Sequence, residues 1–383
     1  MQKYIVLLLL TVLSFPAFSQ QKVMIMEIKD QIDPRMNRYV DLALDHAAEI
    51  EADYVIIEMD TYGGAVTDAK DIVENILNFE KPVWVFIDKD AASAGALISL
   101  ACDSIYMAPG SNIGAATVVT AEGQAAPDKY QSYMRSTMRS LAEEKGRNPR
   151  IAEAMVDENI AIDSISEEGN VITFSTNEAI KYGFCEGKMN SVEQILETNG
   201  VENYEISRFK LSGTEKVIAF FLNPFVSGLL ILVIVGGIWF ELQTPGVGFP
   251  ILAAGIALVL YFVPYYLNGL AENWEIIAFF LGVILIALEI LVIPGFGVAG
   301  LAGIFLTVSS LILVMLNNDA FDFSFVPFEK AFIAVSTTIV GLIGSAVVLF
   351  IGGVRLTNTK FFSRIALTET MNKSEGYTSN FKK

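Results

Sequence analysis

Residues 88–116 read DKDAASAGALISLACDSIYMAPGSNIGAA, and this stretch decides how the first half of the chain folds. The run VWVFI at 83–87 predicts a buried strand just before it, and ALISLAC at 96–102 has the spacing of a buried helix. The step from strand to helix falls at Ser93-Ala94. Backbone N–H groups at a helix start are unpaired and stabilise a nearby oxyanion. We therefore predict that Ser93 is a nucleophile and that the Ala94 N–H is an oxyanion donor.

Short apolar strands alternate with amphipathic helices on both sides of this stretch, which predicts an α/β fold. Their continuous apolar runs indicate a parallel sheet that is covered on both faces. Expected strands lie in KVMIMEIK, YVIIEMD and PVWVFID, and expected helices lie near residues 35–51, 65–78, 127–145 and 149–157. VITFS, NEAIKYG and FCEG then read as strand, helix and strand.

The paired glycines of EMDTYGGAV close a strand and open a helix. No side chain at Gly63 or Gly64 blocks a substrate carbonyl, so the Gly64 N–H is a second candidate oxyanion donor. A glycine pair is also ordinary turn chemistry, so this signal is weak when it stands alone. The segment APGSNIGAA, residues 108–116, is a second loop beside the predicted cleft or merely a turn around Pro109-Gly110.

A serine hydrolase needs a base, and His46 is the only histidine of the chain. It stands among acidic residues on an expected helix, so we interpret it as a solvated surface residue. Lysine is the known substitute for histidine when burial favours its uncharged form. Lys129, in the first turn of the helix expected after Pro127, is our candidate. An exposed lysine that opens an amphipathic helix is the alternative interpretation.

Composition excludes several classes of function. The net charge is −17, and 33 Asp/Glu stand against 17 Lys/Arg between Lys22 and Lys210, so a nucleic-acid-binding surface is not expected. The lone histidine and scattered carboxylates have no zinc-ligand spacing. No P-loop is found, so we predict neither a metal nor a nucleotide cofactor.

Residues 1–19 have a basic start, a short apolar run and small residues at a cleavage point, which predicts a secretory signal peptide. An N-terminal anchor is the alternative, although the apolar run is short for a membrane span. Cys102 and Cys185 are too few for a disulfide framework. They form either one bridge or two buried thiols, and the helical spacing around Cys102 favours buried thiols.

The composition changes after Lys216, where five stretches are apolar enough to span a bilayer: 217–242, 249–266, 276–293, 298–316 and 331–354. Five spans place the exported domain outside and the basic tail after residue 356 inside, as the positive-inside rule requires. This predicts a multi-pass protein of the cytoplasmic membrane with its first domain on the outer side.

The apolar half contains an internal repeat, because ELQTPGVG at 241–248 recurs as EILVIPGFG at 289–297. This pattern indicates a duplicated helical hairpin. Glu241 and Glu289 precede the two turns. Each is either a polar group held within the helical bundle or a snorkelling residue near the membrane interface.

Together these residues resemble the long form of the NfeD family, membrane-bound serine proteases related to the Clp protease and signal-peptide-peptidase-A folds. The resemblance runs from about Val23 to Tyr377. It rests on MDTYGGAV, the stretch 88–116, SLAEEKGRNPRIAEAMV and NEAIKYGFCEG, in the order of the family.

The resemblance implies a spiral of ββα units that assembles into dimers or larger rings. It also implies a Ser–Lys dyad of Ser93 and Lys129, with Gly64 and Ala94 as the oxyanion hole. The implied substrate groove contains Tyr62, Gly63, Gly95, Ile113 and Gly114. The implied partners are stomatin- or flotillin-type membrane proteins, whose flexible apolar segments would be cleaved.

Four regions are expected: a signal peptide at 1–19, an exported Clp-like protease domain at 20–212, a transmembrane domain at 213–356 and a short basic tail at 357–383.

Two features depart from the family pattern. Tyr62 replaces the usual proline before the glycine pair, and the sequence has no inner OB-type barrel after the tail. The alternative to a protease is a catalytically idle membrane scaffold. A transporter role is disfavoured, because few ionisable residues lie within the spans.

Overall fold

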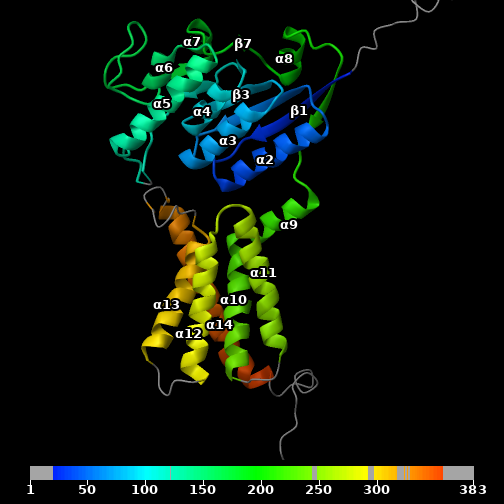
Figure 1. Ribbon diagram of the computed structural model, residues 1–383, viewed down its shortest axis with the longest axis vertical. Helices are drawn as coiled ribbons and strands as arrows, with labels where there is room; N and C mark the ends of the chain where they lie inside the picture. Colours follow the sequence, from blue (N-terminus) through cyan, green and yellow to red (C-terminus); the bar gives the residue numbers. More distant parts are fainter. Residues whose placement is uncertain are drawn as a thin grey trace, which may run out of the picture. The chain divides into compact units, whose positions relative to one another are not determined.

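The computed structural model describes residues 20–120, 122–243, 248–291, 297–316, 323, 326 and 328–356. The chain divides into two compact units between Leu211 and Ser212, and each is described by itself. Figure 1 shows an α/β unit followed by a unit of helices. This confirms the expected fold class. The predicted signal peptide and basic tail lie outside the described residues.

A single eight-stranded sheet forms the centre of the first unit. Its order is β6-β5-β3-β2-β1-β8, and β4 pairs with both β3 and β7. All pairings are parallel except β5 with β6. The strands are β1 (Gln21–Ile28), β2 (Tyr54–Thr61), β3 (Val83–Ala92), β4 (Ser104–Met107), β5 (Asn112–Gly114), β6 (Thr173–Ser175), β7 (Gly187–Lys188) and β8 (Tyr204–Arg208).

Side chains alternate between two hydrophobic cores, because successive residues of a strand point to opposite faces. Met24 and Met26 of β1 belong to the larger core, whereas Val23 and Ile25 belong to the smaller one. All four are buried, so both faces of the sheet are covered, as the continuous apolar runs predicted.

Seven helices accompany the sheet, and their buried residues fill these two cores. They are α2 (Pro34–Glu49), α3 (Val66–Asn78), α4 (Ala94–Ala101), α5 (Asp128–Glu144), α6 (Pro149–Ala154), α7 (Thr176–Lys181) and α8 (Val192–Thr198). Helix α8 contributes Val192, Ile195 and Leu196 to the smaller core. Helix α4, which is buried along its whole length, belongs to the larger core.

Cys102 and Cys185 are both buried free thiols, which settles the choice left open by the sequence. Burial raises the pKa of Cys102 to about 12 and that of Cys185 to about 11. Neither side chain is therefore a reactive thiolate near neutral pH.

The second unit consists of α9 (Gly213–Phe221), α10 (Pro224–Gln243), α11 (Phe249–Leu267), α12 (Asn273–Leu291), α13 (Val298–Leu313) and α14 (Phe328–Leu356). Among the described residues, four helices are long and apolar enough to cross a membrane: α10, α11, α12 and residues Phe328–Phe350 of α14. The expected span at 298–316 is a shorter apolar helix of 16 residues, about 24 Å long.

The expected continuous span over residues 217–242 is wrong, because the chain breaks between α9 and α10. Pro224 begins α10, and its missing N–H and fixed φ suit the first position of a new helix. Asn223 caps this start, since its Oδ1 accepts the N–H of Phe225 at 3.0 Å. A nine-residue helix therefore precedes the first long helix.

The two repeated hairpins share one contact. Glu241 of α10 accepts the N–H of Gly248, which caps α11, with the closer oxygen at 3.0 Å. Glu289 of α12 accepts the N–H of Gly297, which caps α13. Glu289 is only 4% exposed. Each carboxylate thus lies at the positive end of the following helix, so the glutamates are polar groups that close the hairpins.

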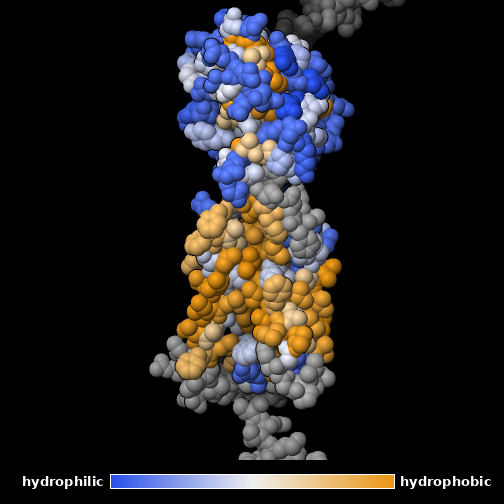
Figure 2. All heavy atoms as spheres, turned by 90° about the vertical axis from the view of Figure 1, so that its left-hand side faces the viewer, coloured by the Kyte–Doolittle hydropathy of each residue, from blue (hydrophilic) through white to orange (hydrophobic). Residues whose placement is uncertain are grey.

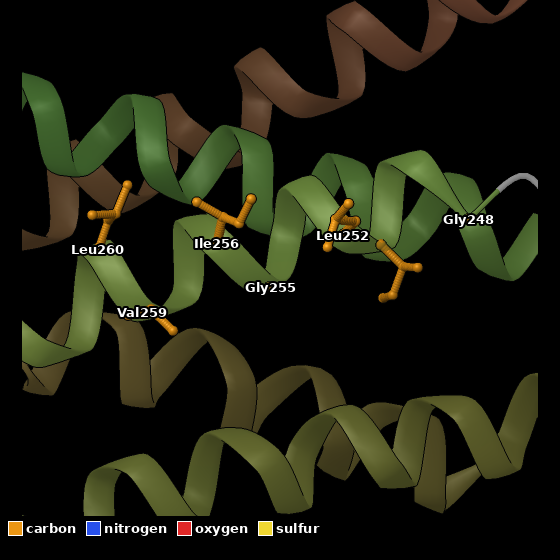
Figure 3. A pocket seen from close by; sticks show the side chains of 7 residues that line it. Gly248, Leu252, Gly255, Ile256, Val259 and Leu260 are labelled. Carbon is orange, nitrogen blue, oxygen red and sulfur yellow. The ribbon is translucent and has the colours of Figure 1, made fainter. Parts of the chain in front are cut away.

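Apolar side chains cover the visible face of the helical unit, as Figure 2 shows. One open groove of about 750 Å³ follows α11 and is lined by apolar side chains and two glycines (Figure 3). Its lining residues are Gly248, Ile251, Leu252, Gly255, Ile256, Val259 and Leu260. None of them belongs to the predicted active site.

Candidate active site

Ser93 occupies the corner between β3 and α4, as its sequence position predicted. Its backbone has φ 55° and ψ −115°, a conformation that residues with a side chain rarely adopt. The N–H of Ser93 donates to the carbonyl of Gly114 at 2.9 Å, and its carbonyl accepts the N–H of Ala96 at 3.0 Å. Such a strained turn costs about 1–3 kcal/mol and is typical of functional sites. A serine between strand and helix is also the arrangement of a nucleophile elbow.

Gly63 lies against this serine. A Cβ added at Gly63 would stand 2.6 Å from the Cβ of Ser93 and 3.0 Å from its Oγ. The φ of Gly63 is +103°, which also favours glycine. Its N–H donates to Thr61 Oγ1 at 3.1 Å. Only glycine fits this position beside the hydroxyl.

Gly64 follows in a turn that pairs with the segment before α2. Two hydrogen bonds hold it: the Ile32 N–H donates to the Gly63 carbonyl at 2.9 Å, and the Ala65 N–H donates to the Ile32 carbonyl at 2.8 Å. A Cβ on Gly64 would overlap the Ile32 carbonyl. Across the part of the chain that the structure describes, the N–H groups of Gly64 and Ala94 have no protein acceptor. Both donors are free to bind an anionic oxygen.

The remaining groove residues divide into exposed and buried ones. Tyr62 is 83% exposed and stands just before the glycine pair. Gly95 is buried, and its missing Cβ leaves room for the Thr61 methyl group. Gly114 is buried and supports Ser93 through its carbonyl. The side chain of Ile113 is fully buried in the larger core, so this residue can face a groove only through its backbone. Strand β5, to which it belongs, pairs on both sides and turns this side chain inward.

Lys129 lies in the first turn of α5, and a contact at the other end of this helix shows how α5 is oriented. Lys145, just past that other end, pairs with Asp103 at 2.7 Å. Asp103 in turn accepts the N–H of Val83, the first residue of β3, at 2.8 Å. Helix α5 therefore ends near the start of β3.

A second contact joins the first half of α5 to α3. The Nζ of Lys70 on α3 lies 4.8 Å from the centre of the Tyr133 ring on α5. Tyr133 follows Lys129 by one helical turn, and Lys70 follows the start of α3 by one turn. The Lys129 side chain itself is exposed, with its Nζ 4.5 Å from the centre of the Tyr130 ring. The structure thus brings Ser93, Gly63, Gly64 and Ala94 together, and it leaves the amine of Lys129 in solvent.

Gln131 is a residue that the sequence analysis missed. Its Oε1 accepts the N–H of Val118 at 3.1 Å, and its Nε2 donates to the carbonyls of Val118 at 2.6 Å and Ala126 at 3.3 Å. This buried amide clamps both ends of the segment 118–126 to the first turn of α5, which carries Lys129. The sequence does contain a signal for this role: Gln131 is a polar residue at the helical spacing of Met134 and Met138, on the buried face of an amphipathic helix.

His46 takes no part in this site. It lies in the last turn of α2, its ring centre is 5.6 Å from that of Phe209, and its Nδ1 is 3.8 Å from Glu49. No group of three metal-ligating side chains occurs among the described residues.

Two domain families match the chain. The family described as NfeD1b, N-terminal domain, matches residues 22–209, and the NfeD integral membrane domain matches residues 225–354. Membrane protein NfeD1b of Bacillus subtilis is 33% identical over 94% of this chain and 80% of its own length. The membrane-bound protease PH1510 of Pyrococcus horikoshii is 26% identical over 82% of this chain and 74% of its own.

Solved structures give a further likeness to the first unit. The 1510-N membrane protease of P. horikoshii, described as specific for a stomatin homolog, is 27% identical with a TM-score of 0.42. The match covers 53% of this chain and 98% of that one. The resemblance predicted from the sequence motifs is confirmed by the domain matches and by the relative that is 33% identical. The chain therefore belongs to the NfeD1b family of integral membrane proteins.

Proposed function

We propose that this protein is a membrane-bound serine endopeptidase in which Ser93 is the nucleophile and Lys129 the general base. The main support for this proposal is the strained backbone of Ser93. This residue lies beside a glycine turn and at the start of a helix, and both offer free N–H groups. The kinship with the protease PH1510 supports the reaction class.

Peptide cleavage then follows acyl-transfer chemistry. Lys129 takes the proton of the Ser93 hydroxyl, and Oγ forms a bond with the substrate carbonyl carbon. The Gly64 and Ala94 N–H groups hold the oxyanion that results. The C–N bond breaks as Lys129 returns the proton to the leaving amine. Water, deprotonated by the same amine, then attacks the acyl-enzyme and releases Ser93.

The exposed amine of Lys129 must approach Ser93 for this reaction. We propose that a polypeptide bound across Ser93 also covers Lys129 and removes water from it. Desolvation favours the uncharged form of an amine, which is the form that accepts a proton. We therefore propose that the dyad is completed when a substrate is bound.

The substrate class follows from the relatives and from the membrane unit. PH1510 is described as a stomatin-specific protease, and we propose flexible, apolar segments of stomatin- or flotillin-type proteins as substrates of this chain. We also propose a homo-oligomer in the cytoplasmic membrane, with the first unit on the outer side. The proposed reaction needs no cofactor.

Cleavage of an apolar peptide by the purified full-length protein tests the assignment. Ser93→Ala and Lys129→Ala should each reduce the rate at least about a thousandfold, because removing one member of such a unit removes most of the catalysis. Ser140→Ala and Lys81→Ala, at exposed positions outside the site, are matched controls that should cleave at the parental rate. Parental cleavage by Ser93→Ala would refute the proposal.

A membrane scaffold is the second candidate, and the exposure of Lys129 favours it. In that case the first unit binds stomatin-type partners without cutting them. A serine-directed fluorophosphonate separates the two functions. Labelling of the parent and not of Ser93→Ala supports the protease, whereas an unlabelled parent that still co-purifies with its partner supports the scaffold.

A further inference from the structure

Helix α9 is the first helix of the second unit, and neither matched domain includes it. The N-terminal domain match ends at residue 209 and the membrane domain match begins at 225, whereas α9 spans Gly213–Phe221. Ser212 caps this helix, since its side chain accepts the N–H of Glu215 at 3.2 Å. The break at Asn223-Pro224 separates α9 from the first long helix. With nine residues, about 14 Å, it is too short to cross a bilayer.

The helix has two different sides. Ile218, Phe221 and Leu222 are partly buried, and Leu222 packs against the core of the helical unit. On the outer side Val217 is 56% exposed and Phe220 is 59% exposed. No residue of α9 is buried. A soluble helix seldom displays an aromatic and a β-branched side chain together in this way.

Exposed apolar side chains follow α9 in the first long helix as well. Phe225, in the first turn of α10, is 75% exposed, and Leu229, one turn later, is 49% exposed. Both lie within the residues that match the NfeD integral membrane domain, and α10 is long and apolar enough to cross a membrane. Lys216 lies beside the apolar residues, where its ammonium can extend to lipid headgroups.

We propose that α9 lies in the interface of the lipid bilayer, with Val217 and Phe220 inserted among the acyl chains. The occupant of its exposed face is lipid and not a second protein chain. The helix then acts as an anchor between the last strand of the first unit and the first long helix.

This anchor limits how far the first unit can move from the membrane. Phe209 is fixed to the sheet, because its N–H donates to the carbonyl of Ile25 at 2.8 Å and its ring packs on Tyr39 at 5.3 Å between centres. Only Lys210 and Leu211 separate it from the helix cap at Ser212. Three steps of extended chain span at most about 11 Å. If the proposed function holds, substrate segments are cleaved within the reach of a domain that is tethered this closely to the bilayer.

Single-cysteine variants of the full-length protein test the lipid contact. Val217→Cys, Phe220→Cys and the control Lys216→Cys are labelled with the environment-sensitive dye NBD and reconstituted in phosphatidylethanolamine/phosphatidylglycerol vesicles. Cys102 and Cys185 are buried, so the parental chain serves as the unlabelled blank. Brominated acyl chains should quench the dye at positions 217 and 220 at least about threefold more than at 216.

Three outcomes are distinguishable. Strong quenching at 217 and 220 supports the anchor. Equal, weak quenching at all three positions with free access for dithionite overturns it, because α9 is then in water. Protection from dithionite without quenching also overturns it, because a protein then covers the helix. None of these results depends on protease activity.

A functional variant tests the consequence separately. Val217→Glu combined with Phe220→Glu should reduce cleavage of a vesicle-inserted peptide about tenfold, because charged side chains leave the interface. The same variant should cleave that peptide in detergent at the parental rate. Equal cleavage in vesicles contradicts the tethering. Loss of cleavage in both media contradicts a role limited to anchoring.

Discussion

The hydroxyl of Ser93 depends on a glycine that touches it. The φ of Gly63 is +103°, and an added methyl group would stand 2.6 Å from the serine Cβ. Gly110 has a similar φ of +84° but has nothing within 4 Å of an added Cβ. Alanine at either position would strain the backbone, but only alanine at Gly63 would also push Ser93 aside. Comparing the two substitutions therefore distinguishes the two effects.

Gly63→Ala should abolish fluorophosphonate labelling of Ser93, whereas Gly110→Ala should leave it intact. Both substitutions should lower the free energy of unfolding by about 1–3 kcal/mol, because alanine disfavours positive φ. Mass spectrometry of the labelled protein, together with thermal unfolding, measures both effects. Full labelling of a folded Gly63→Ala variant would show that this contact does not position the hydroxyl.

Buried thiols give a second prediction at this scale. The pKa values of Cys102 and Cys185 are raised by burial to about 12 and about 11, so almost no thiolate exists at pH 8. Iodoacetamide should therefore modify neither residue in the native protein and both in urea. Modification of either cysteine before unfolding would contradict their burial.

Local signals in the sequence predicted the place of Ser93 between a strand and a helix, and the structure has it there. The strand, the serine and the helix follow one another in the chain, so their geometry depends on neighbouring residues alone. The surroundings of Lys129 were not predictable in this way. Its exposure depends on which side of α5 packs inward, and Gln131 on the same turn faces the core. A lysine and a glutamine two positions apart point to opposite sides of a helix.

At the scale of elements, the hairpins of the helical unit depend on two glutamates. The two glutamates should contribute unequally to the free energy of unfolding, because Glu289 is only 4% exposed whereas Glu241 is half-buried. Removing the acceptor of a buried N–H group lowers stability more than removing the acceptor of an N–H group that can bind water instead.

Glu289→Ala should destabilise the protein by about 1–3 kcal/mol, because the N–H of Gly297 then has no acceptor. Glu241→Ala is the matched change in the other hairpin and should cost less. Thermal unfolding of the detergent-solubilised protein compares the two. A larger loss for Glu241→Ala would contradict the ranking by burial.

Three strands of the first unit meet at Glu58 of β2. Its carboxylate lies 3.0 Å from Arg208 of β8 and 3.0 Å from Lys29, just after β1. Burial alone would raise the pKa of Glu58, but the hydrogen bonds and charges of Arg208 and Lys29 outweigh it and lower the pKa. The folded state therefore holds this proton less tightly than the unfolded state.

Glu58 therefore stabilises the folded state at pH values above its pKa in the unfolded chain, about 4.5. This stabilisation is lost as the pH falls through the lower pKa of Glu58 in the folded protein. Glu58→Gln should thus cost about 1–2 kcal/mol at pH 7 and progressively less toward pH 3. Urea unfolding at several pH values measures this difference. A loss that does not vary with pH would show that packing, and not charge, is responsible.

The helix boundaries show what the pattern of apolar residues can predict. Hydropathy located the long apolar helices, because a helix that crosses a bilayer needs about 20 consecutive, mostly apolar residues. It missed the break at Asn223-Pro224, since the residues on both sides are equally apolar. Only the side-chain cap of Asn223 and the proline at the helix start reveal that two helices meet there.

At the scale of the whole molecule, each unit has a hydrophobic core of its own. The cores of the first unit contain no residue beyond Phe209, and the core of the helical unit begins at Leu222. Folding of the first unit therefore does not require the second.

Residues 20–211 expressed alone should fold to a monodisperse protein with one cooperative urea transition, because both cores are complete within this range. Circular dichroism and size-exclusion chromatography measure this. An aggregated or non-cooperative product would show that the membrane unit is needed for folding.

The carboxylate-to-glycine contact is kept in both hairpins although the second connection is one residue longer than the first. The entry of the returning helix is thus set by one acid and one amide, and not by how many residues lie between them. A connection lengthened by one residue should accordingly leave the start of the returning helix in place, provided that the acid and the glycine remain.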